Sequence, residues 1–233
     1  MNGADSMGRP EFAAIVAAFG PPIDDAEFER RVAERAQAAE AERRADQVAK
    51  ARRIFAELDL PERWTLETFH ADDFPEFDQV ARAVAAGDRS ACLSGPTRSG
   101  KSHAVAALAR MAAYAGRIVY RIEEPNLARL FAQYRGTRQS PLDDIFEKMT
   151  RADLLVYDDI GKSEIARGLA LSDFGAFVFA AFDKRAEHRR RNIATTRYPT
   201  TAALAEAIGS DMVRRVLQDE PGENGIFATY KKK

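Results

Sequence analysis

The chain has 233 residues, of which 45% are hydrophobic and 30% are charged, and its formal net charge is -1. This length allows one mid-sized domain with an extension, and the composition is typical of a soluble globular protein. A net charge so close to zero excludes global attraction to nucleic acid, so any contact with DNA must come from local basic patches. The single cysteine, Cys92, excludes a disulfide framework within the chain, and the three histidines lie too far apart in sequence to favour a metal cluster.

The sequence shows no targeting signal. Residues 1–22 contain neither a basic segment nor an uninterrupted apolar run, which argues against a signal peptide. No apolar run is long enough to span a membrane. We therefore expect a cytoplasmic protein that makes no contact with membranes.

The first quarter of the chain has helical patterns. Residues 11–19 form a short apolar pattern, and residues 26–58 are rich in Ala, Glu and Arg, which favour helix. Apolar positions are sparse in the middle of the longer segment, so it can bury little surface by itself. Two interpretations are open: a solvated helix carrying i,i+4 ion pairs, or an arm that docks on a partner or self-associates. We assign residues 1–59 to this helical arm and residues 60–233 to the main domain.

The main domain alternates between strand and helix patterns after a linker rich in proline and aromatic residues, residues 60–77. Strands separated by helices predict an α/β fold, with a parallel sheet flanked by helices on both faces. The expected strands lie near residues 91–94, 118–122, 154–157 and 192–195, and the expected helices near residues 79–86, 102–114, 126–134, 142–150, 172–189 and 201–208.

The segment GPTRSGKS, residues 95–102, matches the phosphate-loop pattern G-x-x-x-x-G-K-[ST]. Its glycines allow a tight turn whose backbone N–H groups point at phosphate oxygens, and the helix that follows adds its positive N-terminal end. Lys101 can reach the β- and γ-phosphates, and the Ser102 hydroxyl can bind Mg²⁺. We therefore predict ATP and Mg²⁺ as cofactors. The residues expected to bind the nucleotide here are Gly95, Pro96, Thr97, Arg98, Ser99, Gly100, Lys101, Ser102 and His103.

The segment LLVYDDIG, residues 154–161, is an apolar run that ends in two aspartates, as a buried central strand does at its carboxyl end. Ligands of open α/β sheets bind at that edge. Asp158 would therefore bind Mg²⁺ and belong to the nucleotide site, and Asp159 would orient or activate the attacking water. A glutamate is more usual in the second role. Aspartate is one methylene shorter, so slow hydrolysis is one expectation.

Two further segments carry polar residues that can reach the same edge. The segment RNIATTRYP, residues 191–199, predicts a strand whose end places residues 195–197 beside the aspartates, or simply a solvated strand end. In IGSDMVRRVL, residues 208–217, Arg214 and Arg215 follow a helix. An arginine at this place can complete the site of a neighbouring subunit, or both can lie on a solvated helix face.

In this order, the segments TLETF, CLSGPTRSGKSHAVAAL, DLLVYDDIG, NIATTRYP, IGSDMVRRVL and TYKKK resemble the short AAA+ ATPases, which include DnaC-type replicative helicase loaders and IstB-type transposition helpers. The resemblance covers residues 60–233 and not the arm. The chain ends about 16 residues after Leu217, so the resemblance implies an AAA+ core without the C-terminal lid domain of longer members. The roles it implies are phosphate and Mg²⁺ binding for Lys101 and Ser102, Mg²⁺ binding for Asp158, water activation for Asp159, and for Arg215 action in trans on the next subunit of a homo-oligomer.

Two positions depart from the family pattern. Where the family often has TSN or TTN, this chain has Thr195, Thr196 and Arg197. Either Thr196 then acts as the catalytic sensor of the γ-phosphate, or Arg197 adds a charge there. A family arginine is also replaced by Asp211. Both departures concern hydrolysis rather than nucleotide binding.

The resemblance also implies single-stranded DNA in a central channel of the oligomer. The segment FAQYRGTRQ, residues 131–139, interleaves aromatic residues with Arg135 and Arg138, a combination that can stack bases and hold phosphates. Residues 184–191 and 231–233 are weaker basic candidates. Each of these segments also has a simpler interpretation. The aromatic residues of 131–139 can belong to the core, the arginines of 184–191 can compensate the negative end of a helix, and residues 231–233 can be a solubilising tail.

The expected function is that of an ATPase that loads a replicative DNA helicase onto single-stranded DNA during replication initiation, with residues 1–58 gripping the helicase. A transposition helper of the same fold would direct a transposase instead. A third alternative is an ATP-binding adaptor or switch with little turnover, which the departures at Asp159 and Arg197 favour. A small-molecule kinase is disfavoured, because no arginine-bearing lid segment is evident in the sequence.

Overall fold

The computed structural model describes residues 25–58, 61, 63–64, 68, 74, 76–138, 140–163, 172–218 and 225–230. The chain divides into two compact units, Met1–Asp46 and Gln47–Lys233, and the boundary between them falls inside a long helix. The helix expected at residues 11–19 and the basic tail at residues 231–233 lie outside the described residues. In the described part of the chain, no helix is both long and apolar enough to cross a membrane.

Helix α2 spans Asp25–Leu58, close to the range that its composition predicts, and it crosses the boundary between the two units. In the first unit nearly all of its described side chains are exposed, and several of them form ion pairs four residues apart. The Arg31 guanidinium donates to Glu27 Oε1 at 2.6 Å, and Arg44 pairs with Glu40 in the same way. Pairs of this kind stabilise a helix by about 0.2–0.5 kcal/mol each. This part of α2 therefore has the ion-paired surface expected of a solvated helix.

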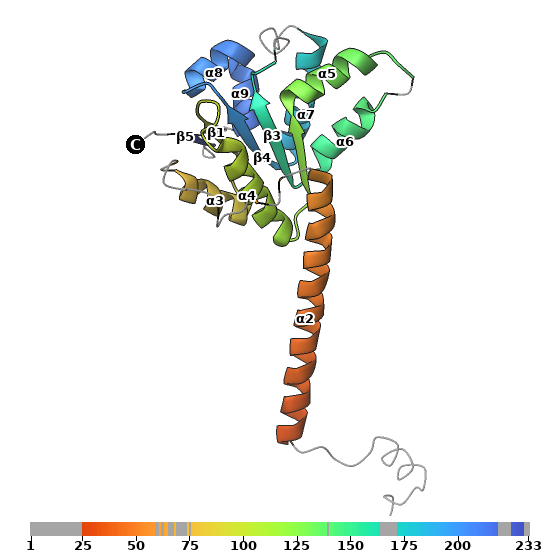
Figure 1. Cartoon of the computed structure of the whole chain (residues 1–233). Coiled ribbons are helices and arrows are strands. Elements are labelled where there is room, and N and C mark those ends of the chain that lie inside the picture. The colour runs from red at the N-terminus through yellow and green to blue at the C-terminus, as the bar shows by residue number, and fades with distance from the viewer. Residues whose placement is uncertain are drawn as a thin grey trace, which may run out of the picture. The chain divides into compact units, whose positions relative to one another are not determined.

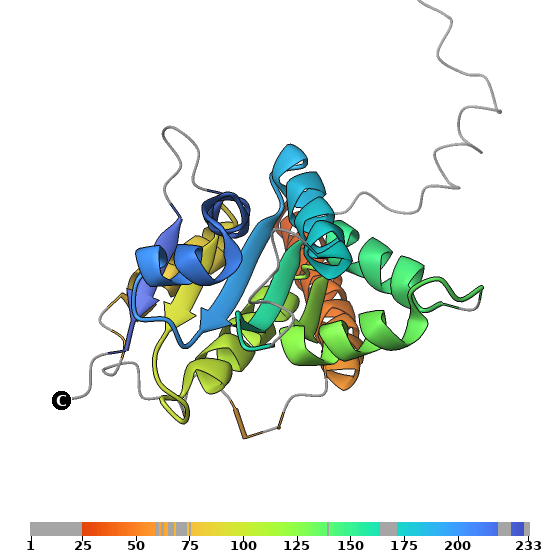
Figure 2. The same ribbon diagram turned by 90° about the horizontal axis from the view of Figure 1, so that it is seen from above.

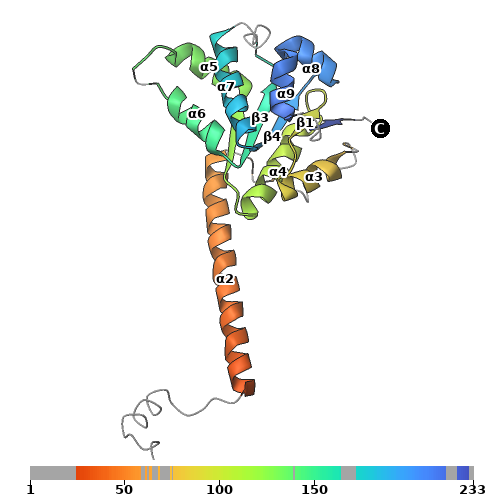
Figure 3. The ribbon, with the colours of Figure 1, turned by 180° about the vertical axis from the view of Figure 1, so that it is seen from behind.

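The described strands of the second unit form one parallel sheet in the order β2-β3-β4-β1-β5 (Figure 1). Helices cover both faces: α4 and α7 lie on opposite sides of the sheet in Figure 2, and Figure 3 shows the same layers from behind. The predicted α/β fold is thus confirmed. The elements in chain order are α3 (Phe77–Ala86), β1 (Ala91–Ser94), α4 (Lys101–Tyr114), β2 (Val119–Glu123), α5 (Glu124–Tyr134), α6 (Leu142–Arg151), β3 (Leu154–Ile160), α7 (Asp173–Glu187), β4 (Arg191–Thr196), α8 (Thr201–Ile208), α9 (Ser210–Leu217) and β5 (Ile226–Thr229).

The described core residues form two hydrophobic clusters, one on each face of the sheet. Successive side chains of a strand point to opposite faces, and β3 shows this clearly. Leu155 and Tyr157 pack in the cluster with α5, α6, α7, α8 and α9, whereas Leu154 and Val156 pack in the cluster with α3, α4 and the end of α2. Cys92 of β1 is fully buried, and this burial raises the pKa of its thiol to about 12. Cys92 is therefore an inert core residue rather than a reactive one.

One buried arginine of α7 connects the end of α6 to the start of β4. Arg185 of α7 is fully buried and donates to the carbonyl oxygens of Met149 at 2.6 Å and Ala152 at 2.8 Å, at the end of α6. Its Nε donates to Asn192 Oδ1, at the start of β4, at 2.6 Å. The last carbonyls of a helix have no partner within the helix, so Arg185 satisfies groups that burial would otherwise leave unpaired.

We expect Arg185→Met to lower the free energy of unfolding by about 3 kcal/mol or more, because it leaves several buried acceptors unsatisfied. Urea denaturation followed by circular dichroism measures this change. The matched control is Arg129→Met, at an exposed position of α5, for which we expect a change within about 0.5 kcal/mol. Equal losses in the two variants would contradict the structural role of Arg185.

Candidate functional site

The predicted phosphate loop connects β1 to α4 at the carboxyl edge of the sheet. A Cβ atom on Gly95 would lie 2.7 Å from Tyr230 Cβ and 2.8 Å from Ser99 Oγ, so the loop has no room for a side chain there. Gly100 adopts φ 88°, a left-handed conformation that favours glycine, and it precedes Lys101 as the N-cap of α4. Among the described residues, no side chain caps this helix and no acidic residue lies in its first turn. Its first N–H groups are therefore available to an anion.

Lys101 folds back onto the loop that precedes it. Its Nζ donates to the carbonyl oxygens of Gly95 and Pro96 at 2.8 Å each and lies 3.5 Å from Ser99 Oγ. Burial lowers the pKa of Lys101, and the nearby carboxylates of Asp159 and Asp158 oppose that shift. The ammonium group is thus held over the loop by neutral carbonyls, which a phosphate oxygen can replace with a stronger, charge-assisted contact.

A cavity of about 230 Å³ opens beside the phosphate loop. Of the described residues that line it, four are cationic and one is a carboxylate. The lining residues are Thr97, Arg98, Lys101, Ser102, Asp159, Ile160, Lys162 and Arg197. Such an excess of positive charge in a small cavity favours a ligand with several negative charges.

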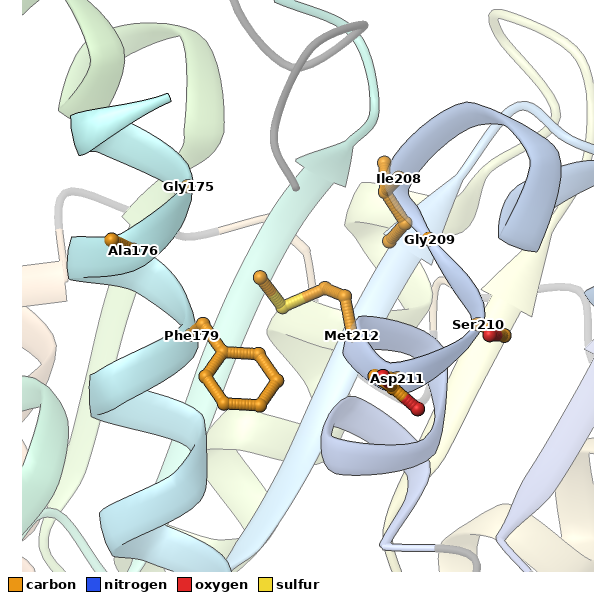
Figure 4. A pocket seen from close by; sticks show the side chains of 8 residues that line it. All are labelled: Gly175, Ala176, Phe179, Ile208, Gly209, Ser210, Asp211 and Met212. Atoms are coloured by element: carbon orange, nitrogen blue, oxygen red, sulfur yellow. The ribbon is translucent and has the colours of Figure 1, made fainter. Parts of the chain in front are cut away.

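A larger cavity of about 540 Å³ lies elsewhere, between α7 and the junction of α8 and α9 (Figure 4). Met212 extends from α9 toward α7, near the ring of Phe179, and Ile208 and Ala176 add further apolar side chains. Asp211 is the one charged residue among its described lining residues. This cavity therefore lacks the cations that a polyphosphate requires, and the smaller cavity is the candidate site.

The first aspartate of β3 is buried between two partners. Asp158 is only 2% exposed, and its Oδ2 accepts from the Arg121 guanidinium of β2 at 2.6 Å. Its Oδ1 accepts a hydrogen bond from the Thr195 hydroxyl of β4. A buried carboxylate requires such partners, because its desolvation would otherwise be very costly. The expected Mg²⁺ ligand is therefore bound to groups of its own chain.

The second aspartate faces the cavity. Asp159 lies at a register shift between Tyr157 and Ile160 and adopts φ 62°, a left-handed conformation that aspartate tolerates better than most residues. Its backbone N–H donates to Thr195 Oγ1 at 2.8 Å, and its carboxylate accepts from Lys162 Nζ at 2.6 Å. The structure thus turns the Asp159 carboxylate toward the phosphate loop and pairs it with a lysine.

A buried glutamate supports this turn. Glu124, at the start of α5, is fully buried. It accepts hydrogen bonds from the backbone N–H groups of Gly161 at 2.9 Å and Ser163 at 3.1 Å. Burial raises the pKa of Glu124, and these hydrogen bonds oppose the shift. Glu124 therefore anchors the segment that carries Asp159 and Lys162.

The structure separates the two residues considered as sensors of the γ-phosphate. Thr196 is fully buried; its hydroxyl donates to the Ile160 carbonyl at 3.1 Å and accepts from the Tyr198 N–H at 3.3 Å. Arg197, by contrast, lines the cavity, with its guanidinium 5.5 Å from the centre of the Tyr198 ring. Of the two side chains, that of Arg197 lines the cavity, whereas the Thr196 hydroxyl is hydrogen-bonded to the end of β3.

Other predicted residues lie away from the cavity. His103 Nε2 lies 3.0 Å from Thr68 Oγ1, and the His103 ring stacks on Trp64 with centroids 6.0 Å apart, so it contacts the linker before α3. Arg215 of α9 pairs through Nε with Asp183 of α7 at 2.9 Å.

The two predicted DNA contacts follow the end of α5. Arg135 pairs with Asp173 at 3.2 Å, and both of these side chains are exposed. Arg138 is exposed as well. Both arginines thus lie on the surface of the domain.

Three site residues were missed by sequence reasoning: Arg121, Lys162 and Glu124. Arg121 interrupts the apolar pattern of β2, and that interruption was the available signal. Lys162 follows directly after the DDIG segment, where a loop at a ligand-binding edge is expected.

The donor groups fit a hard divalent cation. The Ser102 hydroxyl and the Asp159 carboxylate line the same cavity, and oxygen donors of this kind are what Mg²⁺ prefers. The carboxylate of Asp158 adds a third oxygen donor, provided that its contact with Arg121 is exchanged. Ser102 and Asp158 are the residues that would hold Mg²⁺, with Asp159 beside them to orient water.

No family model and no curated protein sequence matches the chain. Solved structures do match. A DnaA structure from Aquifex aeolicus with bound AMPPCP superposes with a TM-score of 0.60 at 18% identity, over 75% of this chain and 52% of that one. A DnaI structure gives 0.58 at 14% identity, over 75% of this chain and 96% of that one. A DnaC helicase loader structure gives 0.53 at 18% identity, over 73% of this chain and 100% of that one.

These matches show that the chain shares its fold with the DnaA, DnaI and DnaC structures. The chain spans about half the length of the DnaA structure and nearly all of the DnaI and DnaC structures. The resemblance of the sequence motifs to those of DnaC-type ATPases is therefore confirmed for the fold.

We expect Gly95→Ala to weaken binding of a nucleoside triphosphate at least about tenfold, because the added methyl group forces the phosphate loop to move. Fluorescence titration with a labelled ATP analogue measures this. Gly116→Ala is the control: Gly116 has φ 82° but nothing within 4 Å of its added Cβ, so the variant carries backbone strain away from the loop. Unchanged affinity in folded Gly95→Ala protein would contradict the assigned loop geometry.

Proposed function

We propose that this protein binds ATP in the cavity beside the phosphate loop and hydrolyses it slowly. The observation that carries the proposal is the convergence of Arg98, Lys101, Lys162 and Arg197 on one small cavity, at the edge of the sheet where ligands of α/β proteins bind. The fold supports the proposal, since a matching DnaA structure contains the ATP analogue AMPPCP.

In the proposed site, Lys101 exchanges its two carbonyl contacts for phosphate oxygens, and the first N–H groups of α4 bind the same phosphates. Mg²⁺, when bound, neutralises charge on the phosphates. Asp159 accepts a hydrogen bond from the attacking water, and Arg197 stabilises negative charge at the γ-phosphate. The contact of Asp159 with Lys162 must be exchanged before that carboxylate oxygen can accept from water, so we expect slow turnover.

We further propose that the ATPase acts as a helicase loader, which delivers a replicative helicase onto single-stranded DNA. Support comes from the likeness of the whole domain to structures described as the DnaC helicase loader and as DnaI. The arm at residues 1–58 grips the helicase in this proposal. Phe28 and Val32 of α2, which are 61% and 50% exposed, supply apolar contacts for a partner.

Single-stranded DNA is proposed to contact Arg135 and Arg138, after the end of α5. The pair between Arg135 and Asp173 is exposed on both sides, so it contributes little stability and its arginine can turn to a phosphate.

Oligomers are proposed to form with Arg215 acting on the site of the next subunit. Arg215 is partly exposed, so its contact with Asp183 can be exchanged on assembly.

A low-turnover adaptor is the second candidate, and one observation favours it. Asp158 and Asp159 each accept from a cation of the same chain, Arg121 and Lys162. A site whose carboxylates are neutralised in this way can bind nucleotide and act as a switch while hydrolysing little.

We expect specific ATPase activity to rise with protein concentration and with added single-stranded DNA, and Arg215→Ala to lower it at least about a hundredfold without weakening nucleotide binding. The physical reason is that an arginine supplied in trans stabilises charge only in the transition state. Steady-state phosphate release across protein concentrations, with binding measured in parallel, gives the result.

Asp183→Asn is the matched control for this experiment. It breaks the same ion pair but keeps Arg215, so activity should be retained or raised if Arg215 acts in trans. If Asp183→Asn lowers activity as much as Arg215→Ala does, the pair has a structural role and the trans assignment is wrong. If turnover is negligible at every concentration while ATP binds, the adaptor candidate replaces the loader.

A further inference from the structure

Three charged side chains from β2 and β3 meet at the edge of the candidate site. Glu123 pairs with Asp158 in the strand register, and Arg121 lies two residues before Glu123, so all three side chains stand on the same face of the sheet. The face is the one that α4 covers, because Val156 of the same alternation packs in the cluster with that helix.

The Arg121 guanidinium is shared between the two carboxylates. Its Nη2 lies 2.6 Å from Glu123 Oε1 and 2.6 Å from Asp158 Oδ2. Their surroundings differ: the side chain of Asp158 is 3% exposed and that of Glu123 is 37% exposed. The contact with Asp158 is therefore the strong one, since solvent screens it little, whereas Glu123 is a half-exposed second acceptor.

In this geometry Arg121 and a divalent cation would compete for one oxygen atom, Oδ2 of Asp158. Asp158 is the carboxylate proposed to hold Mg²⁺, and its Oδ1 already accepts from Thr195. A divalent cation that approaches Asp158 meets the positive charge of Arg121 on the other oxygen, Oδ2. Two cations this close repel each other strongly in a buried site, so one of them must withdraw.

We propose that Arg121 is a built-in counter-cation that competes with Mg²⁺ for Asp158, and that Glu123 retains Arg121 when magnesium and nucleotide bind. The site then has two arrangements. In one, Arg121 bridges both carboxylates; in the other, it contacts Glu123 alone and Asp158 turns to the metal. The balance between them sets how strongly nucleotide binding depends on Mg²⁺. This inference rests on the proposed ATP site.

The proposal predicts opposite effects for substitutions at Arg121 and at Glu123. Arg121→Gln removes the competing charge, so Mg²⁺ should strengthen nucleotide binding far more than in the unmodified protein. Glu123→Gln removes the acceptor to which Arg121 withdraws, so Arg121 stays on Asp158 and Mg²⁺ should strengthen binding less. General damage to the site would move both variants in the same direction.

The experiment measures the dissociation constant of a fluorescent ATP analogue for the full chain, in EDTA and in saturating Mg²⁺. The readout is the dissociation constant in EDTA divided by the dissociation constant in Mg²⁺, so a larger ratio means that Mg²⁺ strengthens binding more. Complexation of Mg²⁺ by free nucleotide affects this ratio equally in all variants. We expect this ratio to rise at least about tenfold in Arg121→Gln and to fall at least about threefold in Glu123→Gln. Arg129→Gln, the same charge change at an exposed position of α5, should leave the ratio unchanged.

Folding is checked by thermal denaturation, because Arg121→Gln leaves a buried carboxylate without its cation. If that variant does not fold, Glu123→Gln and Arg121→Lys are measured instead. Arg121→Lys keeps the positive charge, so its ratio should stay within about threefold of the unmodified value. A ratio that is unchanged in folded Arg121→Gln, or that rises in Glu123→Gln, overturns the competition while leaving the ATP site intact. If the unmodified protein binds the analogue in neither condition, the proposed function itself fails and the inference falls with it.

Discussion

The parallel register of β1 and β4 is the constraint on which the candidate site depends. Ser94 lies opposite Thr196, and the Gly95 N–H continues the ladder by donating to the Thr196 carbonyl at 3.1 Å. The phosphate loop therefore leaves the sheet at the level where β4 ends. Since parallel strands end at the same edge, β3 delivers Asp158 and Asp159 to that level as well. A loop, a lysine and two carboxylates far apart in sequence meet there because of backbone pairing.

Three charged groups that are expected to meet nucleotide or metal are already bound within the chain. Lys101 donates to loop carbonyls, Asp158 accepts from Arg121, and Asp159 accepts from Lys162. Burial makes an unpaired charge costly, so these internal partners stabilise the site as it stands. Ligand binding must then exchange contacts rather than simply add them. In the proposed site, the affinity for nucleotide and the effect of Mg²⁺ would then depend on side chains such as Arg121, which lies on β2 rather than in the phosphate loop.

Local sequence patterns predicted much of this structure, and the failures have a common cause. The phosphate loop, four strands and the α/β fold follow from short-range spacing, which local backbone chemistry determines. Strand β5 was missed because its four residues, Ile226–Thr229, are held by pairing with β1, a contact far away in sequence. The partner of Arg121 could not be predicted either, because it depends on β2 lying beside β3. The contact of the Thr196 hydroxyl with the Ile160 carbonyl likewise depends on the register at the end of β4, which a pattern of three polar residues leaves open.

The central claim is that the cationic cavity recognises the phosphates of a nucleotide. Calorimetric titration of the unmodified chain with ATP, ADP and AMP, in Mg²⁺, tests it most directly. Because each added phosphate meets charged hydrogen-bond donors in the cavity, affinity should rise from AMP to ATP by about a hundredfold or more. If AMP binds as tightly as ATP, or if none of the three binds, the cavity is not a polyphosphate site and the account is contradicted.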